Sequence, residues 1–209
     1  MKSALWPVMK RNLVAILRGV KTDEIIGIGE ALIAAGFEAI EIPLNSPNPF
    51  DSIAKLARIA PNNVWIGAGT VLTPENVDRL HDAGGRLLVT PNVDPLVLAR
   101  AAHHAMVSMP GVLSPTEALL AIKSGASALK FFPASVIGPS GIAAIKAILP
   151  HDCVIGAVGG VSEVNFADYM KIGVRTFGLG SSLYKPGFSA AEVAKRAEIS
   201  VKAYDGAAQ

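Results

Sequence analysis

Short apolar runs alternate with longer mixed segments along the whole chain, and glycine or proline separates most of them. Such runs are typical of strands buried on both faces of a parallel sheet, with helices covering those faces. The pattern predicts eight strands, each followed by a helix. The predicted strands are residues 13–17, 39–43, 64–68, 86–90, 106–109, 126–133, 153–158 and 175–179.

The segments between these runs carry helix start and stop signals. Thr22 is a candidate N-cap, Pro115 stands at a first helical position, and Glu117 is placed to complete a capping box with Ser114. Glycines end several of the segments. The predicted helices are residues 22–35, 50–60, 74–83, 94–104, 114–124, 141–149, 162–172 and 189–204, with a short leading helix at 3–10.

A helix-ending glycine that leads into a strand recurs at Gly36, Gly84, Gly125 and Gly173. The spacing corresponds to roughly 23 residues per unit, and eight such units fit the chain length. We therefore predict an α/β fold, a (β/α)8 TIM barrel, forming a single domain over residues 1–209. An open doubly wound sheet is the alternative, but no GxGxxG motif follows the first strand to support it.

Composition narrows the class of protein. The chain is 51% hydrophobic with a net charge of +2 and has no block of lysine and arginine, so no nucleic-acid or anionic-membrane partner is indicated. No apolar segment reaches the length of a membrane span, and Pro7 interrupts the N-terminus too early for a signal peptide. Cys153 is the single cysteine and allows no internal disulfide. We expect a soluble, cytoplasmic protein.

Lys130 is a lone charge in the apolar run 126–133. Burial of an unpaired ammonium lowers its pKa, and a neutral amine in a dry pocket is a nucleophile towards carbonyls. The alternative is a lysine whose stem runs past the end of the strand to water or to a carboxylate.

Glu41 is a second lone charge, between Ile40 and Ile42. It lies on the second predicted strand and Lys130 on the sixth, and even strands of such a barrel fill the same interior layers. Glu41 is therefore predicted to be the proton partner of the amine, with a structural ion pair as the alternative. Active sites of these barrels lie at the C-terminal ends of the strands, and those ends also carry Arg18, Thr70, Pro91, Gly159, Gly160, Gly180 and Ser181.

The glycines at 159–160 and 180 follow the seventh and eighth predicted strands, where such barrels usually bind phosphate through backbone amides. The helix predicted at 162–172 would add its free amides to this site. The alternative is that the glycines serve tight turns. Arg18 suits a carboxylate or a phosphate, or is simply solvated.

The positions of the histidines do not indicate a metal site. His81, His103 and His104 fall on predicted helix surfaces, His151 lies at the opposite end of the barrel, and no cluster has metal-ligand spacing, so we expect no metal and no other cofactor. An amine, a carboxylate and a phosphate cradle together imply an imine with a ketone and proton transfer at the adjacent carbon of a phosphorylated sugar skeleton. That is class I aldol chemistry.

Five motifs carry a resemblance to a known family: EIPLNSP at 41–47, IGAGTV at 66–71, TPN at 90–92, LKFFP at 129–133 and AVGGV at 157–161. Together they resemble the 2-keto-3-deoxy-6-phospho-sugar-acid (KDPG/KHG) aldolases over nearly the whole chain, and within that family its galactonate branch. The resemblance implies a homotrimeric enzyme that reversibly splits a phosphorylated sugar acid into pyruvate and glyceraldehyde 3-phosphate.

By this resemblance Lys130 forms the Schiff base and Glu41 is the general acid/base. Arg18 and Thr70 would hold the pyruvate end, Pro91 would also contact substrate, and the phosphate would be bound by Gly159, Gly160, Gly180 and Ser181.

Val158 stands where the gluconate branch carries a threonine, and Asn45-Ser46 where that branch carries Arg-Thr. Both differences favour the galactonate epimer. The rival interpretations are the gluconate epimer as the main substrate, and a phosphosugar-binding barrel without catalysis.

Overall fold

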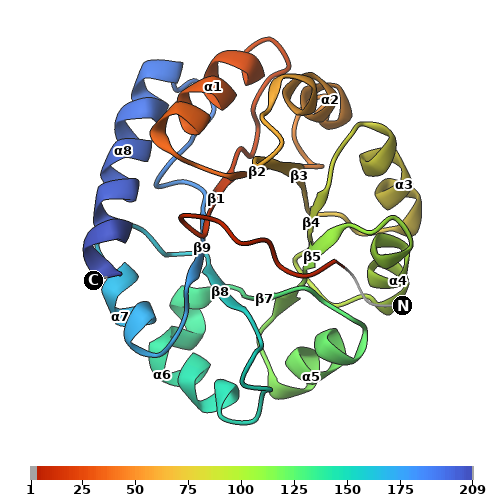
Figure 1. Cartoon of the computed structure of the whole chain (residues 1–209), viewed down its shortest axis with the longest axis vertical. Coiled ribbons are helices and arrows are strands. Elements are labelled where there is room, and N and C mark those ends of the chain that lie inside the picture. The colour runs from red at the N-terminus through yellow and green to blue at the C-terminus, as the bar shows by residue number, and fades with distance from the viewer. Residues whose placement is uncertain (1–3, 209) are drawn as a thin grey trace.

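In the computed structural model, which describes residues 4–208, a ring of parallel strands lies inside a ring of helices (Figure 1). The strand order is β5-β4-β3-β2-β1-β9-β8-β7-β6. Eight of these strands match the predicted ones, so the predicted (β/α)8 barrel is confirmed. The strands are β1 (Leu13–Ile16), β2 (Ala39–Pro43), β3 (Trp65–Gly69), β4 (Leu87–Val89), β5 (Val107–Met109), β6 (Gly111–Val112), β7 (Leu129–Phe131), β8 (Ile155–Val158) and β9 (Thr176–Leu179).

The additional strand arises because the predicted strand at 106–109 continues past Pro110. β5 pairs with β4, whereas β6 pairs with β7, so one bent segment joins the two ends of the sheet. The Lys130 amide donates to the Pro110 carbonyl at this bend (2.9 Å). A Cβ on Gly111 would lie 2.3 Å from the carbonyl oxygen of Pro91, so the close approach of these segments requires glycine. The bend closes the barrel.

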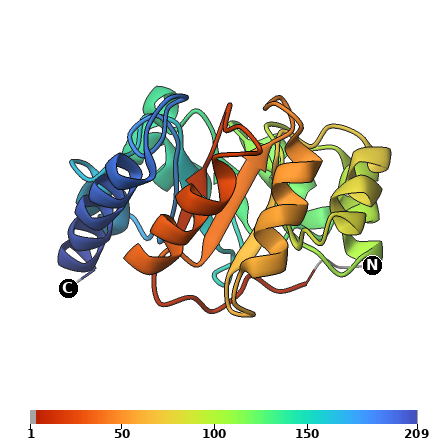
Figure 2. The same cartoon turned by 90° about the horizontal axis from the view of Figure 1, so that it is seen from above.

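Helices cover the outer face of the sheet on all sides (Figures 1 and 2). The capping box predicted at Ser114 and Glu117 is present. No helix within residues 4–208 is both long enough and apolar enough to span a bilayer. The helices are α1 (Ile25–Ala35), α2 (Pro49–Ile59), α3 (Pro74–Asp82), α4 (Pro95–His103), α5 (Pro115–Lys123), α6 (Ala134–Lys146), α7 (Phe166–Lys171) and α8 (Ala190–Ala207).

The bounds predicted for α6 are wrong. This helix begins at Ala134 rather than Gly141 because a short helical turn precedes it. The two pieces meet at a kink where Gly138 takes φ 66° and Pro139 follows. The first piece was not predicted because glycine and proline at adjacent positions normally interrupt a helix.

Two helices begin later than predicted. Thr22 does not cap α1, since its hydroxyl is hydrogen-bonded to the Ser52 hydroxyl of α2 (3.0 Å). α7 begins at Phe166 rather than at residue 162, because Asn165 holds the preceding residues in a turn.

The predicted leading helix is also wrong. Residues 4–10 form an irregular strap across the end of the barrel where the strands begin (Figures 1 and 2), and residue 3 lies outside the described residues. Pro7 lacks an amide hydrogen for a helix. The indole of Trp6 donates to the Asn12 side chain (3.0 Å), and Met9 packs into the base of the barrel. The strap therefore acts as a floor.

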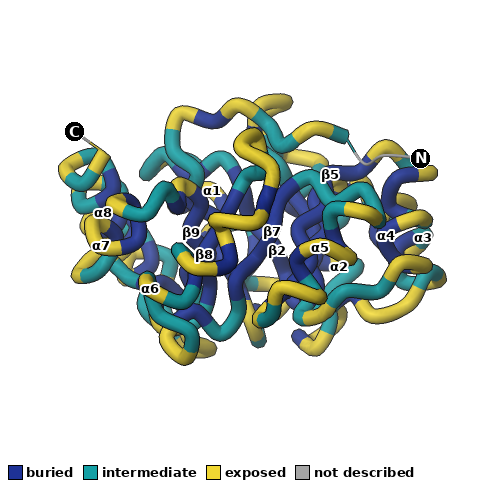
Figure 3. The backbone as a smooth tube through the Cα atoms, turned by 90° about the horizontal axis from the view of Figure 1, so that it is seen from below, coloured by how far each residue is buried: buried dark blue, intermediate teal, exposed yellow. Residues whose placement is uncertain are grey.

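Strand alternation divides the apolar side chains into two clusters. Outward-facing residues such as Ile40 and Phe131 pack beneath the helices. Inward-facing Val14 and Val107 pack with Met9 to fill the lower interior. Buried backbone is accordingly concentrated in the strands, and exposed backbone in the loops and outer helix surfaces (Figure 3). The interior is thus apolar below, and the opposite end of the barrel is left for polar groups.

Met9 is 7% exposed, whereas its neighbour Val8 is fully exposed. Met9→Ala removes buried apolar contacts from the barrel floor and is expected to lower the free energy of unfolding by about 2 kcal/mol. Urea denaturation measures the loss. Val8→Ala is the matched control and should leave the midpoint unchanged. Equal midpoints for wild type and Met9→Ala would show that the strap does not support the barrel.

Candidate active site

A cavity of about 600 Å³ opens at the C-terminal ends of the strands. All the site residues predicted from the sequence line it, and they come from seven of the strands and the loops that follow them. These residues are Arg18, Glu41, Thr70, Pro91, Lys130, Val158, Gly159, Gly160, Gly180 and Ser181.

Lys130 reaches this cavity because it is the inward-facing residue of β7, between outward-facing Leu129 and Phe131. It is 7% exposed, and its Nζ lies 4.7 Å from the centre of the Phe132 ring. Burial lowers the pKa of Lys130 to about 8, although the charge of Glu41 acts to raise it. A larger fraction of this amine than of an ordinary lysine is therefore neutral near neutral pH, and the neutral form is the nucleophile.

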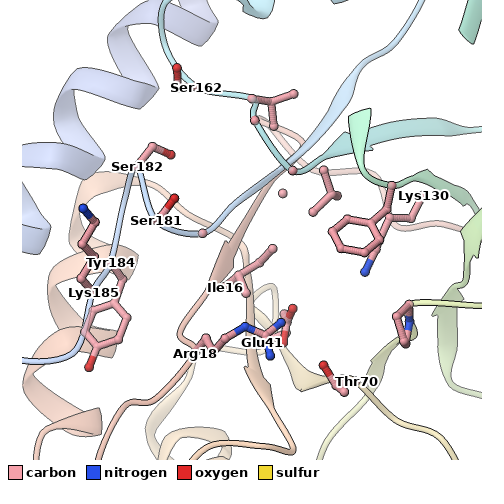
Figure 4. A pocket seen from close by; sticks show the side chains of 18 of the residues that line it. Ile16, Arg18, Glu41, Thr70, Lys130, Ser162, Ser181, Ser182, Tyr184 and Lys185 are labelled. Atoms are coloured by element: carbon pink, nitrogen blue, oxygen red, sulfur yellow. The ribbon is translucent and has the colours of Figure 1, made fainter. Parts of the chain in front are cut away.

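Glu41 occupies the corresponding inward position of β2 and is 2% exposed. Burial raises its pKa to about 7, and the positive charges of Lys130 and Arg18 act against that rise. Its Oε2 atom is buried and has no hydrogen-bond partner. In Figure 4 the Glu41 carboxyl and the Lys130 amine both project into the space between the strands. This carboxyl can take up or release a proton at neutral pH.

Arg18 and Thr70 flank this pair at the mouth (Figure 4). The Arg18 guanidinium donates to the Asn45 side-chain oxygen (2.5 Å), and the next amide, Gly19, donates to the Ser46 hydroxyl (2.9 Å). The loop after β2 thus holds the loop after β1 at two points. Thr70 takes φ 56°, a left-handed conformation that is uncommon for a residue other than glycine and is concentrated at functional sites.

The glycine-rich ends lie across the cavity. Gly159 and Gly160 take φ 88° and 78°, which require glycine. The amides of Val161, Ser181 and Ser182 donate to no acceptor in the described part of the chain. These bare amides suit an anion.

The helix predicted to start directly after these glycines is not there. The Asn165 side chain accepts from the Ser162 amide (3.0 Å) and donates to the Gly160 carbonyl (2.9 Å), which forms a turn ahead of α7. The free amides here therefore belong to loops rather than to a helix, and the predicted contribution of helix amides at residue 162 is wrong.

Part of the cavity wall was not predicted from the sequence. The loop after β9 contributes Ser182 and Tyr184, whose hydroxyl oxygens are buried without a hydrogen-bond partner. Burial, and to a lesser extent the charge of Glu24, raises the pKa of Tyr184 to about 12. The loop between Gly180 and the last helix is unusually long, and this length is the feature of the sequence that could have indicated a contribution to the cavity. The other missed lining residues are Ile16, Phe132, Val161, Ser162, Gly178, Lys185 and Pro186.

No group of three or more histidine, cysteine, aspartate or glutamate side chains within residues 4–208 is arranged to hold a metal ion. The polar groups converging on the cavity are an amine, a carboxyl, a guanidinium, hydroxyls and backbone amides. A (β/α)8 barrel with a buried amine beside a protonatable carboxyl at its mouth is typical of enzymes that form an imine with a carbonyl compound.

Comparison with known proteins identifies the family. Residues 7–199 match the KDPG and KHG aldolase family, and the chain belongs to it. Aldolases are carbon–carbon lyases, so the protein is an enzyme of that class.

Named relatives are similar over nearly their whole length. A Rhizobium meliloti (strain 1021) protein named "Probable 2-dehydro-3-deoxy-6-phosphogalactonate aldolase" is 63% identical over 95% of this chain and 94% of its own. The Escherichia coli (strain K12) protein of that name, without the qualifier, is 46% identical over 96% and 98%. A solved structure described as "Native KDPGal structure" superposes with a TM-score of 0.95 at 46% identity, covering 98% of this chain and 99% of that one.

The charge of Glu41 favours the ammonium form of Lys130. Glu41→Gln removes that charge, so the pKa of Lys130 is expected to fall further below about 8. Titration of protein carrying ε-¹⁵N-labelled lysine measures it by NMR, with the Lys130 resonance assigned by its loss in Lys130→Arg. An unchanged or higher midpoint in Glu41→Gln would contradict the electrostatic coupling of these two groups.

Proposed function

We propose that this protein is a class I aldolase that reversibly cleaves 2-dehydro-3-deoxy-6-phospho-D-galactonate into pyruvate and D-glyceraldehyde 3-phosphate. The main support is the buried Lys130 amine, which shares one cavity with the Glu41 carboxyl. Relatives named for this substrate, 63% and 46% identical, support the substrate assignment.

In the cleavage direction, the Lys130 amine attacks the C2 carbonyl carbon, and a C–N bond forms. Glu41 moves a proton to the departing hydroxyl, water leaves, and a protonated imine results. Glu41 then accepts the proton of the C4 hydroxyl while the C3–C4 bonding electrons flow towards the iminium nitrogen. The aldehyde is released, the enamine takes a proton at C3, and hydrolysis frees pyruvate and the amine.

The remaining lining residues bind the two ends of the substrate. Arg18 supplies a positive charge and Thr70 a hydroxyl for the carboxylate end, with Pro91 beside them on the wall. At the other end, the phosphate is bound by the loop that contains Gly159 and Gly160 and by the loop that contains Gly180 and Ser181. This orientation places C2 at Lys130, on the cavity floor.

Val158 is proposed to select the C4 epimer. It lines the cavity and is 7% exposed, and Gly178 leaves the space that its methyl groups occupy. An apolar side chain offers no hydrogen bond to the C4 hydroxyl, so the epimer that relies on such a bond is bound less well.

We further propose that the enzyme acts as a homotrimer in the cytoplasm. A similar chain, 46% identical with a TM-score of 0.93, occurs in a cage described as made "by fusing symmetric oligomeric domains". Multi-angle light scattering would test the assembly.

Pyruvate with borohydride should reduce the imine and leave a covalent pyruvyl adduct on Lys130, detected by peptide mass spectrometry. Lys130→Ala should lose the adduct. Lys185→Ala removes another lysine of the same cavity and should retain it. No adduct on wild-type protein would leave a phosphosugar-binding barrel without catalysis as the better interpretation.

Val158→Thr keeps the side-chain shape and adds a hydroxyl. Relative kcat/KM for the gluconate over the galactonate epimer is expected to rise by roughly five- to tenfold, the worth of about one hydrogen bond. Val161→Thr, at another buried lining valine, should leave the ratio unchanged. A wild-type enzyme that already prefers the gluconate epimer would overturn the substrate assignment.

A further inference from the structure

We propose that Gly69 is a positioning residue for Glu41: the missing side chain at the end of β3 is what lets the Glu41 carboxyl occupy its place in the cavity. The inference rests on the proposed acid/base role of Glu41. It goes beyond that role by naming the residue that allows the Glu41 carboxyl to take its position.

The geometry at Gly69 is unambiguous. A Cβ added there would lie 2.1 Å from Glu41 Oε2, 2.4 Å from Oε1 and 2.5 Å from Cδ. Unbonded carbon atoms pack at about 3.5–4.0 Å, so the Glu41 carboxyl fills the volume of a side chain at position 69. The three nearest heavy atoms all belong to this one carboxyl group.

The backbone itself does not require glycine at this position. Gly69 belongs to strand β3 and is not among the glycines with positive φ, so alanine could adopt its conformation. Gly67 differs, although it lies on the same face of the same strand. A Cβ on Gly67 would lie 1.8 Å from the Leu87 carbonyl oxygen. The fold needs glycine at Gly67, whereas Glu41 needs it at Gly69.

The strand end around Gly69 is also held in place. The Gly69 carbonyl accepts a hydrogen bond from the Leu44 amide (2.8 Å), and the residue pairs in register with Pro43 of β2. A methyl group at position 69 would therefore displace the carboxyl rather than the strand, and the open side is the cavity.

The test compares Gly69→Ala in two backgrounds, wild type and Glu41→Ala. With Glu41 present, kcat is expected to fall on the order of 10²-fold, the size of a lost acid/base group. Borohydride should still trap pyruvate on Lys130, but more slowly, because Glu41 also assists imine formation. The limb of the pH profile that reports Glu41 should also move below about 7, because a displaced carboxyl regains water and burial is the main cause of its raised pKa. With Glu41→Ala, the added methyl fills vacated space and should change neither residual kcat nor Tm.

A kcat within about threefold of wild type in Gly69→Ala, or an equal loss in both backgrounds, would overturn the proposal. If Gly69→Ala is insoluble, the double variant decides. A folded Gly69→Ala/Glu41→Ala protein supports a clash with the carboxyl alone, and an insoluble one shows that the fold needs Gly69. The Tm comparison requires no turnover, so it stands even if wild-type protein fails to trap pyruvate and the proposed function falls.

Discussion

The removal of two opposite charges from water at one barrel mouth is the constraint on which the site depends. Desolvation raises the pKa of Glu41 to about 7 and lowers that of Lys130 to about 8, while their mutual attraction opposes both shifts. Because both shifts bring the two pKa values closer together, a proton moves between these groups at a lower free-energy cost than between an exposed lysine and an exposed glutamate. Ordinary lysine and glutamate, about six units apart, could not exchange it so readily.

The barrel tolerates these charges because its other residues leave space for them. Lys130 is flanked in register by Gly111 and Gly156, and Glu41 by Gly67 on one side. Small neighbours let a long polar side chain fit inside a narrow ring of strands, while the apolar cluster around Met9 supplies packing below. Stability and chemistry are therefore separated along the barrel axis.

The periodic features were the predictable ones. Apolar runs punctuated by glycine located the strands, and lone charges within them located Lys130 and Glu41, because an isolated charge in a buried run has few structural uses. The strap at 4–10, the bend at Pro110 and the turn held by Asn165 were not predictable, since each depends on contacts with segments or side chains that local pattern does not reveal. Tyr184 was missed for a similar reason: an irregular loop brings it to the wall.

The strap has a further consequence, for the route of substrate and products in the proposed reaction. Residues 4–10 cover the base of the barrel, and apolar side chains fill the interior above them. Molecules that reach the Lys130 amine from solvent therefore enter and leave through the mouth at the opposite end. The three-carbon aldehyde, held nearer that mouth by its phosphate, then stands between solvent and the enamine left on Lys130. The covalent enamine already sets the order of release, aldehyde before pyruvate. The closed base adds that both products leave, and the keto acid enters, through this one mouth.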